Sequence, residues 1–129
     1  MIDDITIVAD AAVRLSIPLL FPALGEWIAE RAGTLNVSIE GMMLAGAFMS
    51  ALGSDWTGSA SLGLLFGMAA GVVVGYIHGQ FSHRASANTF VVGITLTILV
   101  TGLTSFLLSE MTIDSTRTAE LSIPGLAEI

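Results

Sequence analysis

The sequence predicts an all-α, polytopic transmembrane helical bundle with about four membrane segments, one of them broken. Composition is the first reason: hydrophobic residues make up 53% of the 129 residues and charged residues only 12%, whereas soluble domains carry about 25% charged residues. The second is the uncharged run at residues 90–108, which is close to the roughly 20 residues that cross about 30 Å of hydrocarbon. The mean hydropathy of +0.85 agrees with both.

The first two predicted helices carry helix-breaking residues. Residues 11–30 form a helix interrupted by Pro18 and Pro22, because proline removes a backbone donor and clashes with the preceding turn. Residues 37–52 form the second helix, which Gly33, Asn36 and Gly41 break at its start. We therefore expect irregular backbone immediately before this second helix.

The third and fourth predicted helices are uninterrupted. The third covers residues 61–77 and can extend to Gly79, between the turn-like sequences GSDWTGS and HRASAN. The fourth covers residues 90–108. The remainder, residues 109–129, is polar and rich in Thr and Ser, and we expect a polar loop or tail there.

Charged residues are few and indicate orientation. There is no Lys, and the four Arg residues are scattered along the chain, so a nucleic acid partner is not expected. If all four segments cross, Arg31 and Arg84 lie on one side and Asp55 on the other. The positive-inside rule then predicts that the side with Arg31 and Arg84 is cytoplasmic.

No cofactor or metal site is expected. Cysteine is absent, which excludes thiolate ligands. His78 and His83 lack carboxylate neighbours suited to a metal, so we interpret them as interfacial histidines. The glycine-rich stretches lack the lysine of a phosphate-binding loop, and no nucleophile with a base partner supports an intramembrane enzyme.

A glycine recurs every four residues through the third predicted helix. At 3.6 residues per turn such a series forms a smooth groove that lets another helix approach closely. Helix packing is the prediction for this face, since glycine offers no side-chain chemistry. The series comprises Gly63, Gly67, Gly71, Gly75 and Gly79.

Charged residues gather near the end of the first predicted helix, in a chain otherwise poor in charge. Glu26 and Glu30 share one helix face, and Arg31 can pair with either. This pattern predicts an interfacial helix end with a salt bridge, because long charged side chains extend from the hydrocarbon to the interface.

Three polar residues, Asn36, Ser38 and Glu40, alternate with Val37 and Ile39 just before an apolar run. One interpretation is irregular backbone that lines a substrate path, as in the broken helices of transporters. The other is a helix N-cap at Asn36 or Ser38 with Glu40 in the first turn. The two interpretations are compatible, and the residues alone do not separate them.

Three segments carry a family resemblance: ERAGTLNVSIEGMMLAGAF, then ANTFVVG, then LTSFLL. In this order they resemble the permease subunits of bacterial ABC importers for nucleosides and simple sugars, relatives of the ribose and branched-chain amino acid permeases. The resemblance implies a multi-pass protein of the plasma or inner membrane that performs no covalent chemistry. It also implies three partners: an ABC ATPase subunit, a second permease subunit and a substrate-binding protein.

The resemblance extends to candidate path residues, namely Asn36, Ser38, Glu40 and, from the second segment, Asn88. The chain departs from the family pattern at Ser38, where Gly is usual, at Ser86, where Arg is usual, and at Thr97, where Asn is common. It resembles only the first two fifths or so of such a permease, so residues 1–129 are expected to be the N-terminal part of a permease domain. The alternative is a small membrane interaction protein that uses its glycine-lined helix face for packing.

Overall fold

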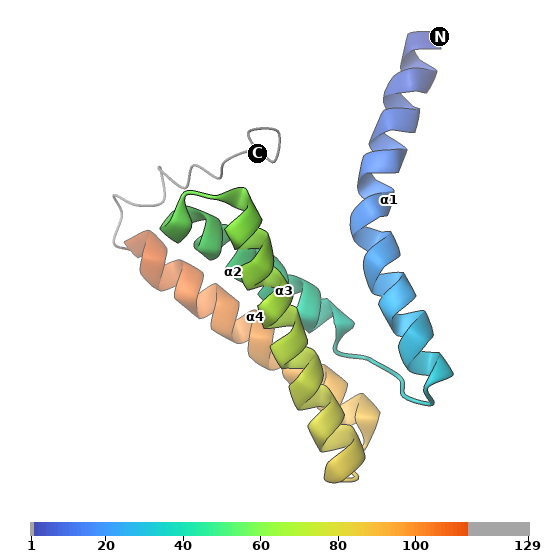
Figure 1. The fold of residues 1–129 in the computed structure, drawn as a ribbon, viewed down its shortest axis with the longest axis vertical. Helices are drawn as coiled ribbons and strands as arrows, with labels where there is room; N and C mark the ends of the chain where they lie inside the picture. The colour runs from blue at the N-terminus through green and yellow to red at the C-terminus, as the bar shows by residue number, and fades with distance from the viewer. Residues whose placement is uncertain (1, 114–129) are drawn as a thin grey trace. The chain divides into compact units, whose positions relative to one another are not determined.

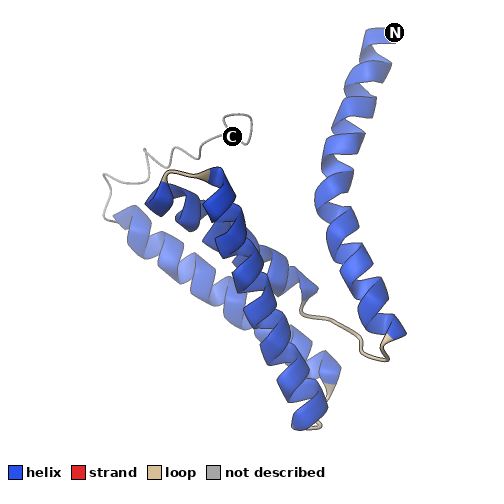
Figure 2. Ribbon diagram, in the orientation of Figure 1, coloured by secondary structure: helices blue, strands red, loops and turns tan. Residues whose placement is uncertain are grey.

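The structure, a computed structural model, describes residues 2–113, which form helices joined by short connections (Figures 1 and 2). In chain order these are α1 (Ile2–Arg31), α2 (Ile39–Thr57), α3 (Ala60–Gly79), the π-helical turn η1 (Gln80–Arg84) and α4 (Thr89–Ile113). No strand occurs in this part of the chain, and the all-α prediction is confirmed. The chain divides between Leu35 and Asn36 into two compact units, which are described separately.

The first unit consists mainly of α1, which is continuous through Pro18 and Pro22. The predicted interruption at these prolines is therefore wrong. Proline is tolerated inside helices of membrane proteins, where neighbouring groups and local adjustments satisfy the freed carbonyls. In its first half, Nε of Arg14 donates to Oδ2 of Asp10 at 2.8 Å. At its end, the guanidinium carbon of Arg31 lies 4.7 Å from the centre of the Trp27 ring.

In the second unit, α2 begins and ends later than predicted. It starts at Ile39 and continues through Thr57, so most of GSDWTGS is helical rather than a turn. The helix ends at Gly58, whose φ of 64° is left-handed and whose N–H bonds to the carbonyl of Ser54. Glycine adopts this conformation without the penalty that a Cβ imposes. Gly53 and Ser54 are buried, which is why helical packing extends through this stretch.

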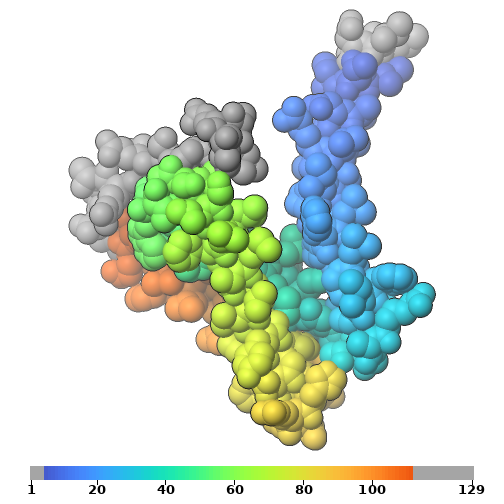
Figure 3. All heavy atoms as spheres, in the orientation of Figure 1, coloured from blue at the N-terminus to red at the C-terminus, as the bar shows by residue number. Residues whose placement is uncertain are grey.

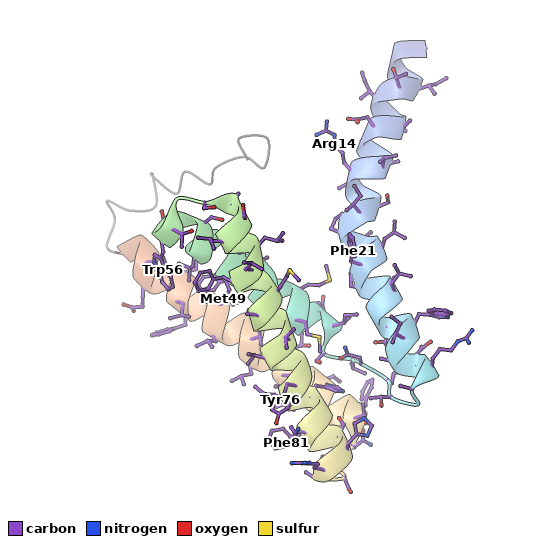
Figure 4. The ribbon with its side chains drawn as sticks, viewed as in Figure 1. Arg14, Phe21, Met49, Trp56, Tyr76 and Phe81 are labelled. Atoms are coloured by element: carbon purple, nitrogen blue, oxygen red, sulfur yellow. The ribbon has the colours of Figure 1, made fainter. Side chains whose placement is uncertain are left out.

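The helices α2, α3 and α4 pack side by side, with α3 antiparallel to the other two (Figure 1). Side chains of α3 and of the α2–α3 turn form a continuous surface in Figure 3. The buried hydrophobic side chains are few: Leu52, Ala60, Val74, Leu96 and Val100. Large apolar residues such as Tyr76 and Phe81 are exposed on α3 and η1 (Figure 4). An apolar exterior around a small core is what lipid-facing helices require.

Within the part of the chain that the structure describes, three helical segments are long and apolar enough to cross a membrane: residues Ile5–Arg31, Ala60–Arg84 and Thr89–Met111. The prediction of a polytopic helical bundle is confirmed. About four membrane segments were expected; the fourth helix of the described residues, α2, carries Glu40 and Asp55 and is not among these three candidates. It packs alongside α3 and α4.

The fourth helix continues through residues 109–113, so it reaches into the segment that was predicted to be a polar loop or tail. Residues 114–129 of that segment lie outside the described residues.

Candidate functional site at the break before α2

Residues 36–38, here called the α2 break, form an irregular segment directly before α2 and belong to the same unit. Ser38 is the N-cap residue, and its carbonyl accepts the N–H of Met42 at 2.9 Å. Its side chain makes no capping hydrogen bond. The predicted N-cap at Asn36 or Ser38 is therefore confirmed at Ser38, without a side-chain cap, and Glu40 lies in the first turn of α2 as predicted.

Asn36 and Ser38 form a polar pair inside the break. The hydroxyl of Ser38 donates to Oδ1 of Asn36 at 2.9 Å, and Ser38 is fully buried, at 0% exposure. Nδ2 of Asn36 lies 3.5 Å from the sulfur of Met42 and donates to it. A buried polar group without a partner costs about 1–3 kcal/mol, so this pairing makes burial of the Ser38 hydroxyl tolerable.

The break lies against α4 at Gly93. A Cβ added to Gly93 would lie 2.5 Å from Cβ of Val37 and 3.1 Å from the backbone nitrogen of Ser38. Only a glycine permits this approach. Gly93 is part of the uncharged run at residues 90–108, so irregular backbone here contacts a helix of membrane-spanning length. Such backbone is tolerated at membrane depth where protein or a cavity covers it.

One turn further along both helices, Gly41 of α2 contacts Thr97 of α4. A Cβ added to Gly41 would lie 3.2 Å from Cα and 3.4 Å from Oγ1 of Thr97. Two glycines, one on each helix, thus bring the start of α2 close to the backbone of α4. Sequence reasoning placed Gly41 near the break but missed Gly93. The position of Gly93 among large apolar residues, in VVGIT, was the signal that could have indicated a close helix contact.

Glu40 and Asn88 are placed differently from the polar pair. Glu40 is exposed. Asn88 is also exposed, and its Oδ1 accepts the N–H groups of Phe90 at 3.0 Å and Val91 at 3.4 Å. Asn88 therefore caps the start of α4. The structure brings Asn36 and Ser38 together, and the path roles of all four residues stay predictions.

The glycine series of α3 meets α2 unevenly. A Cβ added to Gly67 would lie 2.7 Å from the carbonyl oxygen of Gly46, and one added to Gly63 would lie 2.7 Å from that of Ser50. Contacts are looser further along α3: Gly71 approaches only the carbonyl oxygen of Met42, at 3.9 Å, and Gly75 approaches the Met42 side chain. Gly79 has nothing within 4 Å. The tightest approach thus lies at the start of the series rather than at its centre, Gly71.

The two histidines occupy different environments. His78 is only 3% exposed, so it lies inside the helical unit, while His83 is exposed on η1; their predicted place at the membrane interface stays a prediction. Among the described residues, no group of three or more His, Cys, Asp or Glu side chains is arranged to hold a metal ion.

These features define the class: a multi-pass α-helical membrane protein with a polar break packed against an apolar helix. Residues 8–125 match the family described as the permease component of the branched-chain amino acid transport system. The chain belongs to this family of transport-system permease components. No solved structure matches the chain significantly.

Relatives with names support the same family. The chain is 40% identical over 97 residues to the "Putative glucose ABC transporter permease protein TsgC13" of Haloferax volcanii. The aligned region covers 75% of this chain and 30% of the relative. It is 31% identical to a guanosine ABC transporter permease of Bacillus subtilis, over 97% of this chain and 43% of the relative. A nucleoside ABC transporter permease of Lactococcus lactis subsp. cremoris is 31% identical over 84% of this chain and 36% of its own length. The chain thus spans less than half the length of each.

Proposed function

We propose that residues 1–129 are the N-terminal part of the permease subunit of an ABC importer, and that the α2 break lines its path for a nucleoside or a simple sugar. The observation that carries the proposal is the hydrogen-bonded pair of half-buried Asn36 and fully buried Ser38, on irregular backbone against α4. Polar groups are costly at membrane depth and are usually found where they serve a pathway or a structural lock.

The chemistry of the break suits an uncharged, hydroxyl-rich substrate. Asn and Ser side chains both donate and accept hydrogen bonds without carrying charge, which matches the hydroxyl groups of ribose and of hexoses. The relatives named for glucose, guanosine and nucleosides support this substrate class. The residues of the break offer no fixed positive charge that would favour a phosphorylated sugar.

In this proposal the chain acts with three partners: an ABC ATPase subunit that hydrolyses ATP, a second permease subunit and a substrate-binding protein. The rival function, a small membrane interaction protein with a glycine-lined face, accounts for Gly63 and Gly67. It does not account for the family match over residues 8–125, and the permease is therefore the function we propose.

Uptake by the complete transporter that contains this chain tests the proposal. The variant Asn36→Ala removes an amide that can form a hydrogen bond with a substrate hydroxyl, besides the acceptor of the Ser38 hydroxyl, and we expect uptake of radiolabelled guanosine or glucose to fall. One neutral hydrogen bond is worth about 0.5–1.5 kcal/mol, which corresponds to roughly two- to tenfold in affinity. Glu40→Gln is expected to have the smaller effect, because Glu40 is exposed.

Ser59→Ala is the matched control, because Ser59 precedes α3 at the far end of α2 and makes no side-chain cap. It should transport as the wild type does. ATPase association should be unchanged in all three variants. Wild-type uptake by Asn36→Ala and Glu40→Gln together would show that the break has only a structural role.

A further inference from the structure

Three threonines of α4 share one helix face but differ in their hydrogen bonds. Oγ1 of Thr101 donates to the carbonyl of Thr97 at 2.7 Å, and Oγ1 of Thr104 donates to that of Val100 at 2.8 Å. This bond to the preceding turn is how a threonine satisfies its hydroxyl inside a helix. Oγ1 of Thr97 is buried and has no hydrogen-bond partner in the structure. Such a group calls for an explanation.

The surroundings of this hydroxyl are those of the α2 break. Gly41 of α2 covers it, since a Cβ on Gly41 would lie only 3.4 Å from Oγ1. One turn earlier on α4, Gly93 contacts the break at Val37 and Ser38. The Ser38 hydroxyl is already engaged with Asn36 and so does not compete for Thr97.

We propose that Thr97 is a specificity-determining residue of the path, and that its hydroxyl forms a hydrogen bond with a sugar hydroxyl of the substrate. This inference rests on the proposed function. The hydroxyl can donate one bond and accept two, so a neutral sugar hydroxyl is a suitable partner. The residue that covers the hydroxyl, Gly41, has no side chain, so Thr97 is covered only by the backbone of the first turn of α2. A small displacement of the start of α2 exposes the hydroxyl to the path.

A purely structural role predicts a different outcome. Replacing an unpaired buried hydroxyl with a methyl group of the same shape removes a desolvation penalty, so Thr97→Val should leave folding unchanged or more stable. If Thr97 contacts substrate, the same variant should instead weaken transport. The two readouts, detergent stability and uptake, therefore separate the two roles.

The experiment measures uptake of radiolabelled guanosine and of glucose by the complete transporter in proteoliposomes. Thr97→Val should raise KM about two- to tenfold for the transported substrate, with stability at or above that of the wild type. Thr97→Ser should restore KM. The matched control is Thr101→Val, on the same face one turn away, whose hydroxyl is exposed and bonded to its own helix; its KM should equal that of the wild type.

Deoxy analogues of the transported substrate identify the contact. The analogue that lacks the contacted hydroxyl should have the same KM in the wild type and in Thr97→Val. Comparing uptake of guanosine with uptake of glucose shows whether that hydroxyl belongs to a nucleoside or to a free sugar. An unchanged KM in Thr97→Val, or equal changes in Thr97→Val and Thr101→Val, overturns the role of Thr97. If the wild type takes up neither compound, the proposed function itself fails and this inference fails with it.

Discussion

Replacing Gly67 with alanine is the sharpest test of how α2 and α3 pack. A Cβ at this position would lie 2.7 Å from the carbonyl oxygen of Gly46 and 2.9 Å from Cβ of Ser50. The first of these atoms is backbone, so a rotamer change cannot relieve the overlap and the two helices must move apart. Overpacking of this kind costs about 1–3 kcal/mol.

Gly79→Ala is the matched control, because it is the same substitution on the same helix. Gly79 has nothing within 4 Å of an added Cβ, and its φ of −62° and ψ of −41° are helical. Alanine is favoured over glycine in a helix by about 0.8–1.0 kcal/mol, so this variant should be unchanged or slightly more stable. The same propensity gain applies to Gly67→Ala, and the difference between the two variants therefore isolates the interhelical contact.

The assay is thermal unfolding of the complete permease in detergent, followed by circular dichroism. We expect Gly67→Ala to unfold several degrees below Gly79→Ala, because a 1 kcal/mol loss typically lowers the unfolding midpoint by about 2–4 °C in a chain of 150–250 residues. Gly71→Ala should resemble the control, since its nearest neighbour is 3.9 Å away. Equal midpoints for Gly67→Ala and Gly79→Ala would refute the close α2–α3 contact.

Three further predictions follow. Gly93→Ala should displace the break and lower uptake in the complete transporter, because the new Cβ would lie 2.5 Å from that of Val37; normal uptake would mean that the contact is dispensable. Asn88→Ala should lower detergent stability by about 1 kcal/mol through loss of the α4 cap, and an unchanged midpoint would contradict that role. In the Cys-free chain, a membrane-impermeant maleimide added to intact cells should label a cysteine at Asp55 but not one at Arg84; the opposite pattern would reverse the topology.

The agreement between sequence and structure was best where a local property decided the outcome. The third helix and the start of the fourth were predicted nearly to the residue, because long apolar runs must satisfy their backbone bonds internally, whereas α4 continues to Ile113, beyond its predicted end. The prediction that α1 is interrupted was wrong, since Pro18 and Pro22 lie within a continuous helix. The sequence GSDWTGS has the composition of a turn, yet burial of Gly53 and Ser54 extends α2 through most of it. In this stretch tertiary packing outweighed local propensity.

The sequence by itself determined that this is a helical membrane protein with a polar break near residue 36, because hydropathy and helix-breaking residues act locally along the chain. Only the tertiary structure decided which small residues meet. Gly67 and Gly79 are equivalent in the four-residue repeat, but a Cβ added to Gly67 would meet the backbone of α2, whereas one added to Gly79 would have nothing within 4 Å. Likewise, Thr97 and Thr101 are one turn apart, but only Thr97 faces Gly41 with a hydroxyl that has no partner. These differences depend on the register between helices distant in sequence, which local periodicity does not specify.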